Sequence, residues 1–282
     1  MEASKLKLNM FNKEIFSLDE GAYIVTGGLG FLGKAHCNAI AAFGGTPIVI
    51  DIHTNGLDDL RKDIELKYHQ KLLFFEADIT SQEKMGEIAN EIEQNLSIKG
   101  LINNAARNPI VTKSGLKNNS RFESYSINEW DLDLKVGLTG SFVCSQIFGK
   151  KMYDNNGGSI INVSSDLGLL SPKQSLYLDP NLDEDNQPVK PVSYPVVKTG
   201  LIGLTRYIAT YWPRKVRCNC ICPGGVLNDQ SEEFLSRVSA EIPLGRLANI
   251  EEYGACIVFL LSNASSYMTG SVVPIDGGRS AW

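Results

Sequence analysis

Gly21-Ala-Tyr-Ile-Val-Thr26, followed at once by Gly27-Gly-Leu-Gly-Phe-Leu-Gly33, is the stretch from which the fold of this chain can be predicted. The first run is rich in β-forming residues, and the second is a glycine loop. A helical pattern then continues to Phe43, and a second apolar run, Pro47-Ile-Val-Ile-Asp51, follows it. The order strand, glycine loop, helix, strand predicts the first unit of a parallel α/β sheet.

The glycine spacing, with a carboxylate 18 residues after Gly33, indicates a binding site for a dinucleotide. Gly27 permits a tight turn, Gly30 lets a pyrophosphate approach the main chain, and Gly33 lets the helix pack on the strand. The first turn of the helix, with Phe31 and Leu32 beside Gly33, offers N–H groups to the phosphates. The simpler interpretation is that these glycines only form a turn, but the strand and helix on either side favour the binding site.

Asp51 bears on which dinucleotide is bound. Its carboxylate, with Ile52 next to it, can accept hydrogen bonds from both ribose hydroxyls of an adenosine. The same charge would repel a 2′-phosphate, so the sequence favours NAD over NADP. The alternative is that Asp51 is a solvated carboxylate at the end of a strand.

The alternation of strands and helices continues to the end of the chain. Further strands are predicted at 72–75, 100–106, 158–165, 216–221 and 272–275, and helices at 55–68, 81–93, 127–153 and 194–211. Strands that alternate with helices predict a doubly wound parallel sheet of the Rossmann type with helices on both faces. No repeat and no linker rich in Gly or Ser divides the chain, so residues 1–282 are predicted to form a single cofactor-binding and catalytic domain.

Two polar stretches interrupt this alternation, at about 107–126 and 166–192. Each follows the carboxyl end of a predicted strand, where open α/β sheets bind their ligands. Loops of this length within a domain are usually functional. We therefore expect both insertions to lie over the active site.

The composition of the chain excludes several classes of protein. The 282 residues are 43% hydrophobic and 21% charged with a net charge of −5, which gives no sign of a nucleic-acid partner. No apolar run approaches the roughly 20 residues that span a bilayer, and Met1 to Glu14 lacks the apolar core of a signal peptide. We expect a cytoplasmic protein without a membrane partner.

The six cysteines fit a reducing compartment. Cys218, Cys220 and Cys222 alternate, which would place three thiols on one face of a strand. Zinc sites usually use Cys-x-x-Cys turns with a fourth ligand, and the three histidines are scattered. The sequence therefore predicts small buried residues in a core strand and no metal site.

Ser193-Tyr-Pro-Val-Val-Lys198 is the stretch that carries chemistry. Tyr194 and Lys198 are four residues apart, so they share one face of a helix. A lysine beside a tyrosine favours the phenolate and lowers the pKa of the tyrosine from about 10, which makes the phenol a usable acid or base. Alone the pattern is more often a solvated lysine on an amphipathic helix, and Ser165 alone is more often a turn cap. The glycine loop upstream favours the catalytic interpretation of all three.

In this order, the motifs resemble those of the short-chain dehydrogenases/reductases. The resemblance covers roughly residues 15 to 280 and includes Thr26-Gly27, Asp78, Asn103-Asn-Ala-Ala106, Ser165, Tyr194-x-x-x-Lys198, Pro223-Gly-Gly-Val226 and Asp276-Gly-Gly278.

The resemblance implies a role for each matching residue. Tyr194 would be the catalytic acid or base, Lys198 would lower its pKa and bind the nicotinamide ribose, and Ser165 would polarise the substrate oxygen. Asp78 and Ile79 would contact the adenine, and Asn104 and Ala105 would lie under the adenosine ribose. The turn of Pro223 to Val226, which includes Gly225, would hold the carboxamide side of the nicotinamide. The family's helices that correspond to 127–153 and 194–211 build tetramers, so a homotetramer or homodimer is expected.

The chain departs from the family pattern at four places. Its glycine spacing, Gly-x-x-Gly-x-x-Gly, is similar to that of the longer sugar-nucleotide branch, and Gly137 stands where the family often has a catalytic asparagine. Ser165 and Tyr194 are 29 residues apart, where about a dozen is usual, and Pro195 follows the tyrosine. Proline in a first helical turn costs no hydrogen bond.

These features together predict hydride transfer between NAD and a secondary alcohol or ketone. The polar insertions carry cations, and Arg107, directly after the Asn-Asn-Ala-Ala turn, is the candidate for binding a phosphate or carboxylate of a sugar-derived substrate. One alternative is an NAD-dependent sugar-nucleotide epimerase or dehydratase, although only 58 residues follow Gly224. The other alternative is a regulator that binds a dinucleotide without catalysis.

Overall fold

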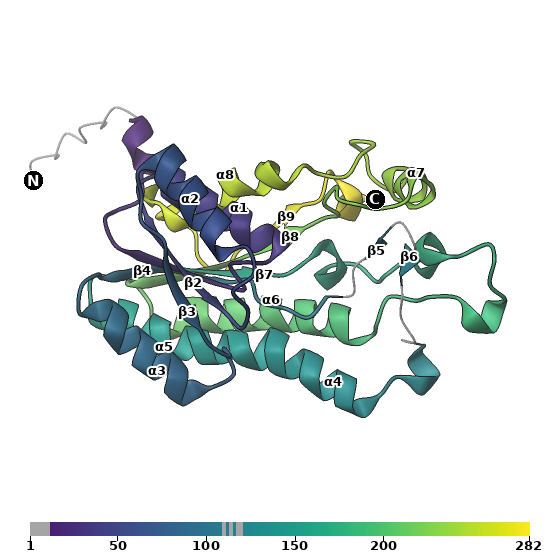
Figure 1. Cartoon of the computed structure of the whole chain (residues 1–282), viewed down its shortest axis with the longest axis horizontal. Coiled ribbons are helices and arrows are strands. Elements are labelled where there is room, and N and C mark those ends of the chain that lie inside the picture. Colours follow the sequence, from purple (N-terminus) through teal and green to yellow (C-terminus); the bar gives the residue numbers. More distant parts are fainter. Residues whose placement is uncertain (1–11, 109–110, 113–114, 117–120) are drawn as a thin grey trace, which may run out of the picture.

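A single parallel sheet of seven strands forms the centre of the protein (Figure 1). We describe it from a computed structural model that covers residues 12–108, 111–112, 115–116 and 121–282. The strand order is β3-β2-β1-β4-β7-β8-β9, and all neighbours pair in parallel. The strands are β1 (Ala22–Thr26), β2 (Thr46–Asp51), β3 (Leu73–Glu76), β4 (Ile98–Asn103), β7 (Gly158–Val163), β8 (Val216–Pro223) and β9 (Val272–Ile275). This confirms the predicted fold class.

Helices cover both faces of the sheet because its central strands are apolar on both sides. One face packs against α1 (Phe31–Ala42), α2 (Leu57–Tyr68) and α8 (Gly254–Leu261), which lie above the sheet in Figure 1. The other face packs against α3 (Gln82–Glu93), α5 (Gly140–Asp154) and α6 (Ser193–Tyr211). Ile24 and Ile48 contribute to the core below the sheet, and Val25 and Val49 to the core above it, as the alternation of side chains along a strand requires.

The strand order creates a switch point between β1 and β4. The chain runs outward from β1 to β2 and β3, and then crosses back to place β4 on the other side of β1. In open α/β sheets, ligands bind beside the carboxyl ends of the strands at such a switch point. The glycine loop after β1 and the Asn103–Ala106 turn at the end of β4 both lie at this edge.

Most predicted elements are present within two residues of their expected ends. The predicted helix at 127–153 consists of α4 (Ile127–Leu134), a π-helical turn (Lys135–Thr139) and α5. The sequence analysis did not predict α7 (Glu232–Ser239) or α8. The cysteines Cys218, Cys220 and Cys222 are fully buried in β8, as expected for small core residues.

The two polar insertions contain little regular structure. The described part of the first contains a two-stranded antiparallel sheet, β5 (Val111–Thr112) with β6 (Gly115–Leu116), and the rest of residues 109–120 lies outside the described residues. The second contains three short 3₁₀ turns, at Asp166–Gly168, Gln174–Tyr177 and Glu184–Asn186. Within the described part of the chain, no helix has the length and apolar character needed to cross a bilayer.

Candidate active site

The glycine loop has the backbone geometry that a bound pyrophosphate requires. Gly27 has a φ of +62°, and a Cβ added to Gly33 would collide with the carbonyl oxygen of Gly27. α1 begins directly after the loop, and its first intrahelical acceptor is Gly30, which receives the N–H of Lys34 at 3.1 Å. The N–H groups of Phe31, Leu32 and Gly33 therefore have no acceptor among the described residues, and such groups at a helix N-terminus bind phosphate.

The carboxylate of Asp51 lies beside this loop and is hydrogen-bonded to it. One carboxylate oxygen accepts the N–H of Leu29 at 3.1 Å, and the other accepts the N–H of His53 at 3.2 Å. The carboxylate is thus fixed beside the loop while it keeps further lone pairs for ribose hydroxyls. Ile52 next to it is exposed, as a residue in contact with an adenine would be in the ligand-free protein.

The carboxyl ends of β1 and β4 are tied together beneath the glycine loop. The hydroxyl of Thr26 accepts the N–H groups of Asn104 and Ala105 at 3.0 and 3.1 Å. The side-chain amide of Asn104 donates to the carbonyl oxygens of Thr26 and Gly27, both at 3.0 Å. These contacts fix the main chain under the glycine loop, where the resemblance places the adenosine ribose. Asp78 and Ile79 follow β3, which lies beyond β2 in the sheet.

The candidate nicotinamide pocket follows β8. The turn of Pro223 to Val226 is held by a bridge from Val226 to Ala248, and Gly225 accepts the N–H of Ala248 at 3.0 Å. The hydroxyl of Tyr253 donates to the carbonyl oxygen of Gly224 at 3.1 Å. These contacts fix the main chain of the turn at the same edge of the sheet as the glycine loop.

Ser165, Tyr194 and Lys198 lie together at this edge. Ser165 follows β7, and Tyr194 and Lys198 lie in the first turns of α6, so Pro195 occupies a position that needs no N–H. The ammonium of Lys198 lies 5.6 Å from the ring centroid of Tyr194 and donates to the carbonyl oxygen of Val163 at 2.8 Å. The side chain of Ser165 lowers the pKa of the Tyr194 phenol, so these two residues lie close to each other.

The electrostatics of the pair differ from the expectation. Burial raises the pKa of Tyr194 to about 12, and the hydrogen bond with Ser165 only partly opposes this effect. Burial also lowers the pKa of Lys198 to about 8. The sequence analysis predicted a lowered pKa for Tyr194, and this is wrong for the ligand-free chain because desolvation disfavours the phenolate and the charges of Asp166 and Tyr177 act in the same direction.

Comparison with known proteins identifies the family. A family profile described as short chain dehydrogenase matches residues 22–177, and one described as enoyl-(acyl carrier protein) reductase matches residues 184–280. The chain belongs to the short-chain dehydrogenase/reductase family. Members of this family are oxidoreductases that act on CH–OH groups and use a nicotinamide cofactor.

Individual relatives match over almost the whole chain. The chain is 31% identical over 261 residues to the 3-oxoacyl-(acyl-carrier-protein) reductase FabG of Aquifex aeolicus, which covers 90% of this chain and 95% of the relative. It is 27% identical over 275 residues to the NAD-dependent glycerol dehydrogenase of Listeria innocua, with coverage of 95% and 96%. It also resembles a solved structure of a putative NAD(P)-dependent gluconate 5-dehydrogenase from Beutenbergia cavernae with bound NADP. That likeness has a TM-score of 0.78 and 26% identity, and it covers 95% of this chain and 99% of the other.

Gly137 shows how this short-chain dehydrogenase differs where an asparagine was expected. It lies in the π-helical turn, and its carbonyl oxygen accepts the hydroxyl of Ser141 at 2.9 Å. A Cβ at this position would lie 2.5 Å from Cγ1 of Val197 on α6. The carbonyl oxygen of Gly137 therefore already accepts one hydrogen bond, and a side chain at this position does not fit beside α6 without movement.

Arg107 lines a cavity together with Tyr194 and Lys198, but its guanidinium is paired with carboxylates. Its guanidinium contacts Glu129 at 3.0 Å and Asp133 at 2.9 Å, both on α4. Asp133 in turn accepts the hydroxyls of Tyr125 at 2.7 Å and Ser193 at 2.5 Å. A cavity of about 10 Å³ separates this network from Tyr194 and Lys198, roughly the space of one water. The role of Arg107 in substrate binding stays a prediction.

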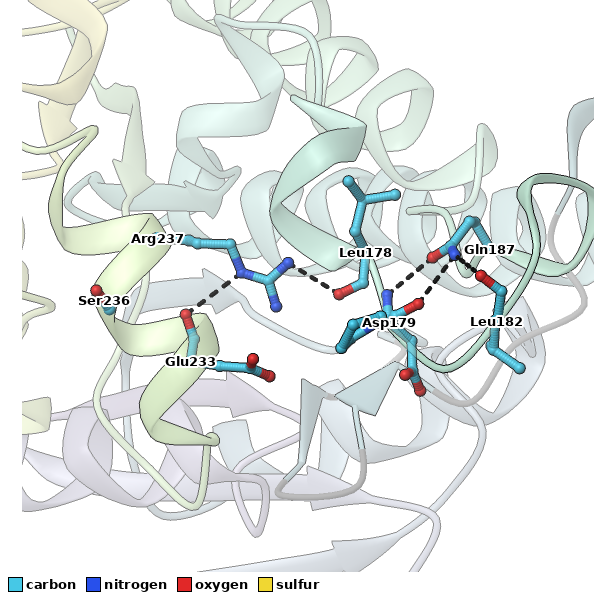
Figure 2. A pocket seen from close by; sticks show the side chains of 8 residues that line it. Leu178, Asp179, Leu182, Gln187, Glu233, Ser236 and Arg237 are labelled. Atoms are coloured by element: carbon cyan, nitrogen blue, oxygen red, sulfur yellow. Dashed lines mark hydrogen bonds between the residues drawn. The ribbon is translucent and has the colours of Figure 1, made fainter.

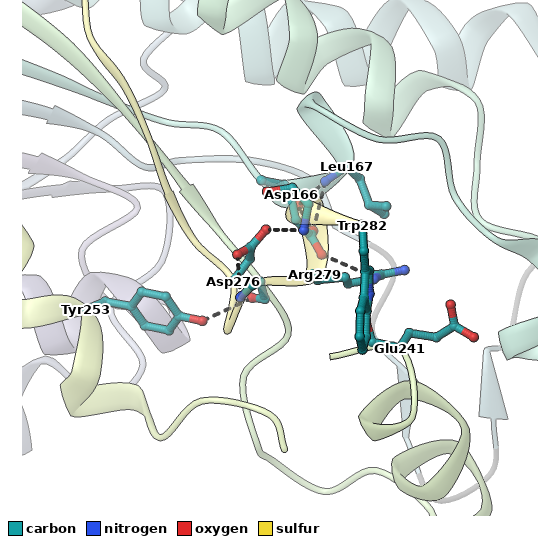
Figure 3. Close-up of polar contacts among 11 residues, drawn as sticks. Asp166, Leu167, Glu241, Tyr253, Asp276, Arg279 and Trp282 are labelled. Atoms are coloured by element: carbon teal, nitrogen blue, oxygen red, sulfur yellow. Dashed lines mark hydrogen bonds and ion pairs between the residues drawn. The ribbon is translucent and has the colours of Figure 1, made fainter. Parts of the chain in front are cut away.

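Three charged residues near Tyr194 were not assigned to the site by the sequence analysis. Lys190, in the second insertion, holds its ammonium 4.1 Å from the ring centroid of Tyr194 and donates to the side chain of Asn108 at 2.9 Å. Asp166 accepts the hydroxyl of Ser165 at 2.8 Å and pairs with Arg279 at 2.7 Å (Figure 3). Lys190 was noted only as one of several cations, and no local pattern indicated the pairing of Asp166 with Arg279.

A larger hollow of about 470 Å³ lies between the second insertion and α7. Arg237 of α7 donates to the carbonyl oxygen of Leu178 at 2.8 Å and so links the two segments across it (Figure 2). The family profiles leave residues 178–183 unmatched, and this gap falls on the same insertion. The hollow shares no lining residue with the cavity beside Tyr194, so we do not assign the reaction to it.

Proposed function

We propose that this protein transfers a hydride between NAD and a secondary alcohol or ketone, with sugar-derived compounds as candidate substrates. The observation that carries the proposal is the convergence of Ser165, Tyr194 and Lys198 at the sheet edge that holds the glycine loop. Ligands of open α/β sheets bind along this edge. A dinucleotide laid across it can therefore present its nicotinamide to the phenol of Tyr194.

Each residue has a distinct part in the reaction. The nicotinamide cofactor, when bound, accepts or supplies the hydride. In ketone reduction, the hydroxyl of Tyr194 donates its proton to the substrate oxygen, and its raised pKa keeps that proton in place at neutral pH. In oxidation, the phenolate takes the hydroxyl proton of the substrate. Ser165 holds the oxygen on which charge develops, and for this its hydroxyl must turn from Asp166 to the substrate.

Asp51 supports the choice of NAD, since it holds a negative charge where NADP carries its 2′-phosphate. Among the relatives, the glycerol dehydrogenase is described as NAD-dependent, while the gluconate dehydrogenase structure contains NADP. The ratio of kcat/KM for the two cofactors decides the question. A wild-type enzyme that prefers NADP would contradict this part of the proposal.

The proposal includes one domain, a reducing compartment and an oligomer. The six cysteines form no disulfide, which supports a cytoplasmic protein. Exposed apolar side chains on α5 and α6, including Phe142, Tyr207 and Tyr211, support a homodimer or homotetramer.

Replacement of Tyr194 by Phe tests the proposed chemistry. NADH formation is followed with a panel of polyols, sugar acids and 3-hydroxyacyl thioesters. We expect the Tyr194→Phe variant to lose about 100-fold or more of kcat with its NADH affinity preserved, because only the proton donor is removed. Tyr207→Phe, on an exposed side of the same helix, is the control and should keep full activity. Equal activity of the parent and Tyr194→Phe would exclude the mechanism.

A further inference from the structure

Arg279 is held at the active site by the last turn of the chain. The carboxylate of Asp276 accepts the N–H groups of Gly278 at 3.0 Å and Ser280 at 2.9 Å, which fixes the backbone on both sides of Arg279. The indole of Trp282 donates to the carbonyl oxygen of Glu241 at 3.1 Å (Figure 3). The position of the guanidinium is therefore set by the fold rather than by a free side chain.

Only one of the three guanidinium nitrogens of Arg279 donates a hydrogen bond to another described residue. Nη1 donates to Asp166 at 2.7 Å, while Nε and Nη2 have no acceptor among the residues that the structure describes. The side chain is 12% exposed, and neither of these nitrogens is fully buried, so a ligand can reach both from solvent. Arginine pairs with carboxylates through two parallel hydrogen bonds, and these two nitrogens are free to make them.

Asp166 connects Arg279 to Ser165. One oxygen of Asp166 receives the hydroxyl of Ser165 at 2.8 Å, and the other receives Arg279 at 2.7 Å. Two hydrogen bonds and one carboxylate therefore separate the guanidinium from the serine that would bind the substrate oxygen.

The surrounding charges favour an anion. Lys190 and Lys198 both hold their ammonium groups near the ring of Tyr194, and both are buried. With Arg279 they give three cations around a site whose buried carboxylates are Asp166 and Asp276. Arg107, by contrast, already has two carboxylate partners.

We propose that Arg279 binds the carboxylate of the substrate, so that the enzyme acts on small hydroxy acids and the corresponding keto acids. This inference rests on the proposed function and narrows its substrate class. In oxidation, the C–H hydride passes to NAD⁺ and the hydroxyl proton to the phenolate of Tyr194, and the product is the keto acid. The carboxylate itself is unchanged and serves only to position the carbinol carbon.

Matched pairs of ligands test the role of Arg279. The full-length protein loaded with NADH is titrated by calorimetry with glycerate and glycerol, threonate and threitol, and gluconate and sorbitol. We expect at least one acid to bind more tightly than its polyol. The Arg279→Gln variant should lose about 10- to 100-fold of that affinity and leave polyol binding within about twofold.

Further variants separate binding from folding. Arg279→Gln leaves Asp166 without its counterion, so the double variant Asp166→Asn/Arg279→Gln, which removes both charges, should fold and still fail to select the acid. Arg279→Lys keeps the charge without the fork and should retain part of the selectivity. Arg107→Gln tests the competing site, since it rather than Arg279→Gln would remove the selectivity if Arg107 bound the acid. Arg206→Gln, at an exposed position of α6, is the control and should select the acid as the parent does.

The possible outcomes distinguish this inference from the proposed function. The inference is overturned if no acid binds more tightly than its polyol, if Arg279→Gln weakens both equally, or if Arg107→Gln alone removes the selectivity. If acids bind through Arg279 but no alcohol is oxidised in the NADH assay, the proposed hydride transfer fails while the carboxylate site stands.

Discussion

At the scale of single residues, burial determines how Tyr194 and Lys198 titrate. The phenol has a pKa raised to about 12 and the ammonium a pKa lowered to about 8. Both shifts arise because burial removes the water that would stabilise the charged form, the phenolate of Tyr194 and the ammonium of Lys198. Between these values the neutral form of both groups dominates in the ligand-free enzyme. A charged Lys198 beside a protonated Tyr194 therefore exists mainly below pH 8.

The pH dependence of ketone reduction should follow Lys198. Reduction needs a protonated Tyr194, which persists well above neutrality, and a charged Lys198, which is lost as the pH rises through about 8. We predict that kcat/KM for reduction is flat at lower pH and falls about tenfold per unit above about 8.

Lys190 is the control for this pH profile, because burial and the charge of Lys198 also lower its pKa to about 8. The Lys190→Gln variant should keep the break in the profile if Lys198 causes it. If the break disappears in the Lys190→Gln variant, the titrating group is Lys190 and the prediction for Lys198 is wrong.

The site residues that could be predicted from the sequence are those whose partners lie only a few positions away in the chain. The glycines of the loop and the pair Tyr194 and Lys198 each lie within one turn of their partners, so a short pattern indicates them. Arg279 and Asp166 are 113 positions apart in the chain and meet only through the fold. No local pattern contains that contact, and the effect of burial on pKa values is equally invisible before the core is known.

At the scale of elements, the π-helical turn between α4 and α5 brings Gly137 against α6. The extra residue of a π turn is frequent at functional sites, and here it lets the glycine approach Val197 closely. A side chain at 137 would force two helices apart near Tyr194. The glycine is thus part of helix packing as well as a departure from the family pattern.

Gly137→Asn tests this interpretation. We predict a loss of about 1–3 kcal/mol in the free energy of unfolding and no gain in activity, because the new Cβ meets Val197. Gly203→Ala, on the neighbouring helix α6, is the control, since nothing lies within 4 Å of its added Cβ, and it should stabilise by about 0.4–1 kcal/mol.

Urea unfolding followed by circular dichroism measures both changes. A second replacement, Val197→Ala, should recover part of the loss in Gly137→Asn because it removes the colliding atom. An asparagine variant as stable as the parent, or more active than it, would show that the position is not limited by packing.

Elements were predictable where their hydrophobic pattern was periodic. The strands of the central sheet are short apolar runs between turn residues, and their alternation with helices predicted that the sheet is parallel. α8 is apolar on nearly all sides, Gly-Ala-Cys-Ile-Val-Phe-Leu-Leu, because it is buried, so it lacks the period of an amphipathic helix. α7 has only eight residues, too few for a confident pattern.

At the scale of the whole molecule, the active site draws on segments from both halves of the chain. The glycine loop ends at Gly33, and Arg279 lies three residues before the end of the sequence. The parallel sheet makes this possible, because every strand ends at the same edge and every following loop lies beside it. The fold class follows from the alternation of elements, whereas the set of loops that meet at the edge depends on strand order.

The same sheet leaves one exposed aromatic cluster at the ends of α5 and α6. The ring centroids of Tyr207 and Tyr211 lie 5.7 Å apart in a stacked arrangement. The centroid of Trp212 lies 5.2 Å from that of Tyr211 and 6.3 Å from that of Tyr153. Tyr207 is 64% exposed and Tyr211 58%. Exposed aromatic groups of this kind mark association surfaces, so the cluster is a specific place to test the proposed oligomer.

The double variant Tyr207→Glu/Tyr211→Glu should lower the molecular mass measured by light scattering from that of a dimer or tetramer to a smaller species. Two carboxylates in a packed aromatic interface would be desolvated without a partner, which costs more than the interface gains. Tyr267→Glu is the control, because Tyr267 is fully exposed and lies outside the cluster, and its mass should match the parent. A parent that is already monomeric, or a double variant with unchanged mass, would mean that α5 and α6 do not form the interface and that each chain carries out its reaction without a partner across this face.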